Sequence, residues 1–277
     1  MIFVTGTKRS GTSMWMQILR GAGLPYLGEP FLAEWESSIV QANPRGFYES
    51  PLRQGVYHAT NPDPRTGAFL APGATRLHAV KVFIPGLVRS DLAYVHRVVA
   101  TLRDWREYGA SLRRLYALED AWFAQLDAPD AQDRHARAVA SRSALPPDVE
   151  WWFENYDLVR DAATRQYPLH LTTYARLLRA PERTIDEVLA WLETGDRAGA
   201  LAAIEPALRT QANPPATKAS LPPHQTAVLD DLFATIDDQR PLSPSLLRAM
   251  NALQAELLRT FNAPGAATNL AKASALQ

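Results

Sequence analysis

The sequence predicts an α/β fold, built as a three-layer sandwich around a central parallel sheet. Short apolar runs of strand character alternate along the chain with longer amphipathic stretches, and this alternation is typical of parallel strands joined by helices. The first apolar run leads directly into a glycine-containing stretch at residues 5–15. A strand, a glycine loop and a helix, in that order, are the parts of a phosphate-binding loop.

Four apolar runs have the length and composition of strands, at residues 2–5, 77–84, 97–102 and 169–174. Helical periodicity appears at residues 14–22, 105–126, 149–166, 181–192 and 244–261. Two of these stretches open on Pro181 and Pro244, and proline is well suited to the first turn of a helix. We expect the helices to cover both faces of the sheet.

The composition predicts a soluble globular protein, since 47% of the residues are hydrophobic and 21% are charged. The net charge is zero, so the overall balance indicates neither a nucleic acid nor a membrane as a partner, and any anion site must be local. The chain has no cysteine, which excludes disulfides, zinc-thiolate sites and thiol catalysis. Neither a leader segment nor an apolar run of about 18 residues occurs, so we expect a cytoplasmic protein.

One domain is expected over residues 1–264, followed by a small, polar and flexible tail at 265–277. Two stretches rich in proline and glycine, at 61–73 and 213–223, are too long for ordinary connections. They are interpreted either as functional lids or as mobile loops. No pattern in the chain indicates its oligomeric state.

The glycine-containing stretch reads TGTKRSGTSMW. Gly6 and Gly11 keep the spacing of a nucleotide triphosphate loop, but Thr12 replaces the lysine that meets the terminal phosphates. The positive charge lies instead at Lys8 and Arg9, and the following helix directs its N-terminal amides at the same point. These features predict an anion site with no obvious metal. The alternative is a strand-to-helix turn that binds nothing.

The pentapeptide RSGTS at residues 9–13 resembles the [KR]-S-G-T-[TS] loop of the sulfotransferases that use 3′-phosphoadenosine-5′-phosphosulfate (PAPS). In that family the loop holds the 5′-phosphosulfate, and its basic residue contacts the transferring sulfuryl group. The resemblance therefore implies a catalytic role for Arg9. It implies a cofactor-binding role for the loop as a whole, namely Lys8, Arg9, Ser10, Gly11, Thr12 and Ser13.

A later segment, RVVATLRDWREYGASL, places Arg103 after an apolar strand and Ser111 eight residues further on. This spacing resembles the family segment that binds the 3′-phosphate of the cofactor; alternatively, Arg103 pairs with a nearby acid on the surface. The segment LTTYARLLRAPERTIDEVLAWLE resembles the family strand that ends in tyrosine, which implies that Tyr174 lies near the adenine. Ala175 replaces the usual acidic residue here, and a tyrosine that closes a core strand is the alternative.

The segment AVKVFIP resembles the cytosolic sulfotransferase segment that ends in K-T-H-L-P. Lys81 and Pro85 match, which implies that Lys81 acts on the sulfuryl group, but Phe83 stands at the position of the catalytic histidine. The general base must then be another residue, because phenylalanine accepts no proton. Together the matching segments span about the first 190 residues.

Three residues are candidates for the base, namely Glu29, Glu49 and His58. Glu29 is slightly preferred, because its separation from the loop helix resembles that of the carboxylate-base members of the family. Glu49 follows an N-P-R-G turn in a stretch that resembles bacterial relatives, and its alternative role is to hold that turn or to pair with Arg45 or Arg53. The aromatic residues of this stretch are interpreted as lining an acceptor pocket or as core: Trp35, Phe47 and Tyr48.

The favoured function is in-line transfer of a sulfuryl group from PAPS to a hydroxyl of a small-molecule acceptor, with a carboxylate as general base. Fixed cations and amides would stabilise the charge that develops. A sulfuryl group carries only one negative charge, so no metal is expected. A P-loop kinase acting on a small molecule is one alternative, although it would need magnesium and a lysine at position 12. A PAPS-binding module without catalytic activity is the other, and Phe83 favours it.

Overall fold

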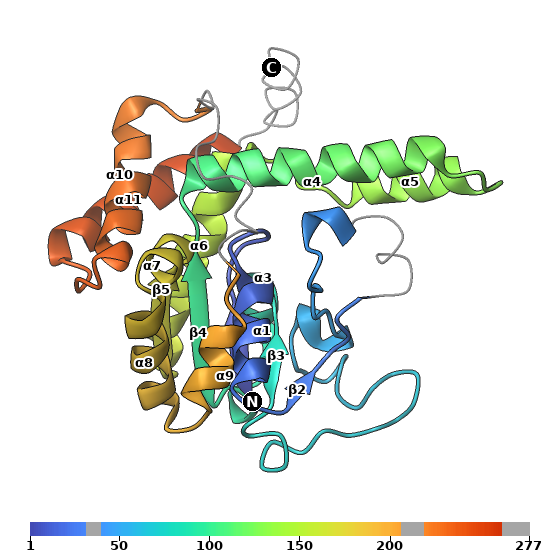
Figure 1. Ribbon diagram of the computed structural model, residues 1–277. Helices are drawn as coiled ribbons and strands as arrows, with labels where there is room; N and C mark the ends of the chain where they lie inside the picture. Colours follow the sequence, from blue (N-terminus) through green and yellow to red (C-terminus); the bar gives the residue numbers. More distant parts are fainter. Residues whose placement is uncertain (32–39, 206–218, 262–277) are drawn as a thin grey trace.

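Five parallel strands form the centre of the molecule in the computed structural model, which describes residues 1–31, 40–205 and 219–261 (Figure 1). The strands lie in the order β2-β3-β1-β4-β5. Their bounds are Ile2–Thr5 for β1, Tyr26–Leu27 for β2, Ala79–Lys81 for β3, Arg97–Leu102 for β4 and Leu169–Thr173 for β5. In register, Val4 of β1 pairs with Lys81 of β3, and Thr5 pairs with Ala100 of β4. The prediction of an α/β fold with a parallel sheet is confirmed.

Two predicted strands, at 2–5 and 97–102, are confirmed with these bounds. The strand predicted at 77–84 is shorter, because helix α3 begins at Ile84 and its first turn contains Pro85. Proline has no N–H to donate to a strand ladder, so pairing ends before it. Strand β2 is absent from the prediction, since two residues form no recognisable pattern.

The helices of the described residues are α1 (Thr12–Gly21), α3 (Ile84–Arg89), α4 (Trp105–Gln125), α5 (Ala131–Ala140), α6 (Pro147–Arg165), α7 (Tyr174–Arg179), α8 (Pro181–Leu192), α9 (Arg197–Ala202), α10 (Pro223–Asp237) and α11 (Pro244–Phe261). Short 3-10 helices are η1 (Val40–Ala42), η2 (Pro51–Gln54) and η3 (Leu92–Tyr94). All five predicted helices are confirmed to within two residues at each end. Strand β5 ends one residue earlier than predicted, because the Thr173 hydroxyl accepts a hydrogen bond from the Arg176 amide and starts α7.

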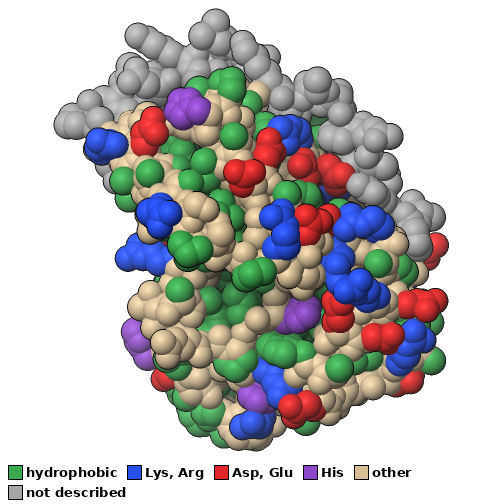
Figure 2. All heavy atoms as spheres, turned by 90° about the vertical axis from the view of Figure 1, so that its left-hand side faces the viewer, with side chains coloured by type: hydrophobic (Ala, Val, Ile, Leu, Met, Phe, Trp, Pro, Cys, Tyr) green, Lys and Arg blue, Asp and Glu red, His purple; other side chains and the backbone are tan. Residues whose placement is uncertain are grey.

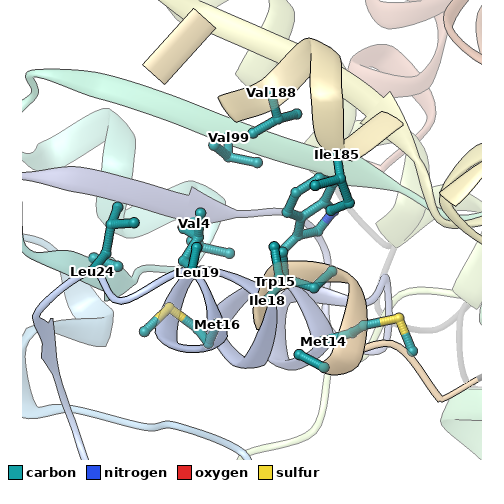
Figure 3. Close-up of a cluster of buried hydrophobic side chains, with 14 of the residues drawn as sticks. Val4, Met14, Trp15, Met16, Ile18, Leu19, Leu24, Val99, Ile185 and Val188 are labelled. Carbon is teal, nitrogen blue, oxygen red and sulfur yellow. The ribbon is translucent and has the colours of Figure 1, made fainter. Parts of the chain in front are cut away.

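Helices cover both faces of the sheet. On one face, Trp15 of α1 and Val188 of α8 cluster with Val4 and Val99 of the strands (Figure 3). On the other face, α3 and α6 pack against a second cluster that includes Phe3 of β1. The order of helices, sheet and helices is consistent with the predicted three-layer sandwich.

A further group of helices lies beyond the carboxyl end of β4. Helices α4, α6, α10 and α11 share a third hydrophobic cluster, which includes Trp105, Trp152, Leu229 and Met250. Helix α4 extends past this cluster with α5 beside it, so that the pair lies above the segment that contains η1 (Figure 1). None of the α5 side chains is fully buried.

Charged side chains of both signs are mixed on the face that carries α8 and α10, around a hollow where hydrophobic side chains gather (Figure 2). Neither sign of charge dominates this face. Over the described part of the chain, no helix combines the length and the apolar character needed to cross a membrane. The predicted tail at 265–277 and part of the second proline-rich stretch, 213–218, lie outside the described residues.

The carboxyl ends of the strands meet at one edge of the sheet. Strand β1 leads into the loop at 6–11, β3 ends at Lys81, and β4 and β5 end shortly before Arg103 and Tyr174. The strand order reverses at β1, since β2 and β3 lie on one side of it and β4 and β5 on the other. Open parallel sheets bind their ligands beside the carboxyl ends at such a point.

Candidate active site

A cavity of about 490 Å³ lies at this edge of the sheet, within the size range of small-molecule sites. Most of the predicted site residues line it, namely Lys8, Arg9, Gly11, Thr12, Ser13, Glu49, Lys81, Arg103 and Tyr174. Three predicted residues, Ser10, Glu29 and Ser111, are not part of the lining. The structure therefore brings residues from distant parts of the chain to one cavity.

The loop at 6–11 is shaped by its two glycines. Gly6 has φ 153°, and a Cβ there would lie 2.4 Å from both the Ser10 Oγ and the backbone oxygen of Thr101. Gly11 has φ 104°, and a Cβ there would lie 2.7 Å from the ring of Tyr174. Only glycine fits at either position, so the spacing seen in the sequence has a steric cause.

The first turn of α1 has no side-chain cap. Its N-cap residue is Gly11, which offers no acceptor, and the turn contains no acidic residue. The leading amides and the positive end of the helix dipole are therefore suited to an anion. Ser10 turns inward, where its Oγ donates to the Thr7 oxygen at 2.7 Å and its carbonyl accepts from the Thr101 hydroxyl at 3.2 Å. Ser10 thus stabilises the conformation of the loop and does not face the cavity.

Arg9 is the central charge of the loop. Its backbone has φ 66°, a left-handed conformation that costs a residue with a side chain roughly 1–2 kcal/mol. Its Nε donates to the Ser111 Oγ at 3.1 Å and its Nη2 to the Ala42 oxygen at 2.9 Å, and no carboxylate among the described residues pairs with it. Burial, reinforced by the nearby Arg103, lowers the pKa of Arg9 to about 10. A bound anion would favour the charged form of Arg9 and so oppose the lowering of its pKa by burial and by Arg103.

Arg103 lies directly against this loop. Its Nη1 donates to the Arg9 oxygen at 3.1 Å, and its Nε donates to Glu107 at 3.1 Å. The pairing with a nearby acid is thus present, although it is buried rather than on the surface, because the Arg103 side chain is only 8% exposed. The guanidinium lies 4.9 Å from the centre of the Tyr174 ring. Ser111 accepts from Arg9 and retains its own O–H as a donor.

Lys81 and Glu49 form an ion pair on the β3 side of the cavity. Lys81 Nζ lies 2.6 Å from Glu49 Oε1, and the two side chains are 6% and 4% exposed. Nζ also donates to the Phe47 oxygen at 2.9 Å and to the Ser13 Oγ at 3.3 Å. Burial lowers the pKa of Lys81, and Glu49 opposes that shift. The buried Glu49 Oε2 has no hydrogen-bond partner among the described residues, so it can accept one from a ligand.

The other two candidates for the base lie outside the cavity. Glu29 is exposed, and only its backbone meets Glu49, through a hydrogen bond of 2.8 Å from its amide to the Glu49 oxygen. His58 is exposed and does not line the cavity. Neither Arg45 nor Arg53 forms an ion pair with Glu49 in the described structure. The geometry therefore favours Glu49 over Glu29, against the slight preference drawn from the sequence.

The remainder of the cavity comes largely from residues that the sequence did not single out; the exceptions are Phe47, Arg53 and Phe83. Phe47 lines it, Tyr48 is buried in the core, and Trp35 lies outside the described residues. Helix α4, helix α5 and the turn that follows α5 cover one side of the cavity, through Leu115, Tyr116, Glu119, Ala138, Ser141 and Arg142. Arg142 donates to Glu119 at 2.7 Å, which joins the turn after α5 to α4. No sequence motif indicates these positions, and helix α5 was not among the predicted helices.

The proline-rich stretch at 61–73 lies toward the end of the molecule opposite α4 and α5 (Figure 1). Asn61 holds it through Nδ2, which donates to the Leu70 oxygen at 3.0 Å and to the Tyr94 hydroxyl at 2.7 Å. Tyr94 precedes β4, so this contact is at the amino end of that strand. No residue of the stretch lines the cavity, and a role as its lid is not supported.

Comparison with known proteins adds no constraint, because no protein-family model matches the chain and no curated protein matches it in sequence. The chemistry of the site is therefore inferred from its own residues. The described lining contains six basic side chains against two acidic ones, namely Lys8, Arg9, Arg53, Lys81, Arg103 and Arg142 against Glu49 and Glu119. This excess of positive charge suits a ligand with several negative charges.

Proposed function

We propose that this protein transfers the sulfuryl group of PAPS to a hydroxyl group of a small-molecule acceptor. The proposal rests chiefly on Arg9, a guanidinium with no carboxylate partner in the described structure, held inside the β1–α1 loop. Arg103 and the uncapped amides of α1 lie beside it. We interpret the loop as a P-loop-like phosphosulfate-binding loop. A buried cation without a carboxylate partner is costly unless an anion binds beside it, so this interpretation is favoured over a strand-to-helix turn that binds nothing.

The residues around the loop fit the two anionic ends of PAPS. Lys8, Arg9 and the amides of the first turn of α1 would hold the 5′-phosphosulfate. Arg103 keeps guanidinium donors beyond those used for Arg9 and Glu107, so with the Ser111 hydroxyl it would hold the 3′-phosphate. Tyr174 offers an aromatic ring beside Arg103 for the adenine. When bound, PAPS would supply an activated sulfuryl group whose leaving group is a phosphate.

Glu49 is the residue best placed to receive the proton of the acceptor hydroxyl. Its Oε1 is held by Lys81, which fixes the orientation of the carboxylate, and its Oε2 has no partner among the described residues. Lys81 and Arg9 would stabilise the negative charge that develops on the sulfuryl oxygens during in-line transfer. The chain would thus provide a base and two cations at one cavity.

Two alternatives remain distinct from this proposal. The first is a small-molecule kinase, which would need a lysine at position 12, where Thr12 begins α1 in this chain. The cations of this loop, Lys8 and Arg9, precede the helix instead, which argues against a kinase. A PAPS-binding module without activity is favoured by Phe83, which lines the cavity at the position of the histidine in cytosolic sulfotransferases. The unpartnered Glu49 Oε2 favours an enzyme.

Calorimetry that compares binding of the product 3′-phosphoadenosine-5′-phosphate (PAP) with binding of magnesium ATP distinguishes a sulfotransferase from a kinase. We expect PAP to bind more tightly; tight binding of magnesium ATP alone would favour a kinase. Transfer from PAPS to phenols and aliphatic alcohols tests the second alternative, because binding of PAP without any transfer would indicate an inactive module.

The role of the base is tested with Glu49→Gln and the matched control Glu29→Gln, whose side chain is exposed. Glu49→Gln should slow transfer to an aliphatic alcohol far more than transfer to an acidic phenol, which needs little help in losing its proton. Glu29→Gln should behave as the wild type. The reverse result would assign the base to Glu29. Arg9→Met should lower kcat by about 10²–10³, as is typical for loss of one electrostatic donor.

A further inference from the structure

Arg53 lines the same cavity but has no evident partner there. It is half-buried, and its side chain forms no ion pair and no hydrogen bond with any described residue. Three other basic residues of the lining, Lys81, Arg103 and Arg142, each have a carboxylate partner. The remaining two, Lys8 and Arg9, belong to the proposed phosphosulfate loop. Arg53 is thus available to a second ligand.

The backbone around Arg53 is held firmly at the β3 side of the cavity. Arg53 lies in η2, whose N-terminus is capped by the Ser50 Oγ through a hydrogen bond from the Leu52 amide at 3.0 Å. The Phe83 amide donates to the Arg53 oxygen at 3.0 Å, which joins η2 to the segment that follows β3. Arg53 also comes only four residues after Glu49 in the chain.

The residues assigned to the loop phosphate, the 3′-phosphate and the adenine lie at the strand-order reversal or on its β4 side. Arg9 follows β1, Arg103 follows β4 and Tyr174 follows β5, whereas Arg53 packs beside β3. Strands β3 and β5 are three strand spacings apart, or about 14 Å. A nucleotide that extends from β1 toward β5 therefore leaves Arg53 to the acceptor.

We propose that the acceptor is a hydroxylated organic acid, whose carboxylate binds Arg53 while its hydroxyl meets Glu49. This inference rests on the proposed function. A planar guanidinium matches a carboxylate with two parallel hydrogen bonds, and a half-buried arginine near Lys81 is stabilised by an anion. Met14, Phe47 and Phe83 also line the cavity, and they suit an apolar body between the two polar groups.

The test compares 4-hydroxyphenylacetate with 4-hydroxyphenylacetamide, which keeps the shape and the phenol but removes the negative charge. Each is titrated by calorimetry into protein saturated with PAP. The wild type should bind the acid about 10- to 100-fold more tightly than the amide. Arg53→Gln should abolish this preference and leave affinity for the amide unchanged. Arg248→Gln, an exposed arginine on α11, is the control for loss of one positive charge and should keep the preference.

The outcomes separate this inference from the proposed function. A preference that persists in Arg53→Gln overturns the inference, and so does equal weakening for acid and amide, which would indicate a merely structural role. Wild-type protein that binds PAP but neither phenol also overturns it, while leaving the proposed function standing. Failure to bind PAP at all overturns the proposed function and this inference together.

Discussion

Lys81→Met would leave Glu49 as a buried carboxylate without its counter-charge, and we expect this change to destabilise the fold strongly. The charged atoms are 2.6 Å apart, and the two side chains are 6% and 4% exposed. Lys81 also donates to the buried backbone oxygen of Phe47, which would lose that donor. Glu49→Gln is the reciprocal change, because it leaves the ammonium group buried beside a neutral amide.

The expected loss of unfolding free energy follows from the burial of the Lys81–Glu49 pair. Removing one member of a buried ion pair costs about 3–5 kcal/mol, since the remaining charge keeps its desolvation penalty and loses the attraction. The double variant Lys81→Met/Glu49→Gln has neither charge, so its loss should be about 3 kcal/mol smaller than the sum of the single losses. Arg240 and Asp238 form an exposed pair, 57% and 59% exposed, and Arg240→Met should cost less than about 1 kcal/mol.

Urea unfolding of the four proteins and the wild type measures these free energies by linear extrapolation. Tryptophan fluorescence is a suitable signal, because Trp15, Trp151 and Trp152 are fully buried. Losses that simply add in the double variant would show that the two charges do not stabilise each other. A loss for Lys81→Met no larger than that for Arg240→Met would refute the reasoning as well.

Three further predictions concern the cavity and its surroundings. Arg103→Ala should weaken PAP binding about 10-fold or more in calorimetry while changing adenosine 5′-phosphosulfate little; equal losses would contradict the assignment to the 3′-phosphate. Gly11→Ala should lower both stability and PAP affinity, because its Cβ would lie 2.7 Å from Tyr174, whereas Gly73→Ala, with nothing within 4 Å, should change neither. Burial raises the pKa of Glu154 from 4.5 to about 8, so the stability that its protonated form contributes is lost as the pH rises through that range. Urea unfolding across this range should show a smaller loss in Glu154→Gln than in the wild type, and an identical pH dependence would contradict it.

The sequence by itself determined the main strands, the glycine loop and the starts of two helices, because each of these features depends on residues that are neighbours in the chain. Strands β1 and β4 are buried apolar runs, and parallel strands covered on both faces require such runs. Gly6 and Gly11 mark the loop, since their φ angles and close contacts exclude a side chain. Pro181 and Pro244 mark helix starts, because proline suits the first turn.

The tertiary structure alone decided which candidate carboxylate joins the predicted cations in the cavity, and which further side chains complete its lining. Glu29 and Glu49 meet through their backbones, yet one is exposed and the other is buried. Glu49 is the buried one because Lys81, which lies far along the chain, offsets the cost of removing a carboxylate from water. Arg53 and the lining residues of α4 and α5 also reach the cavity only through packing between distant segments. Periodicity and motif spacing describe neighbours along the chain, so they carry no information about such contacts.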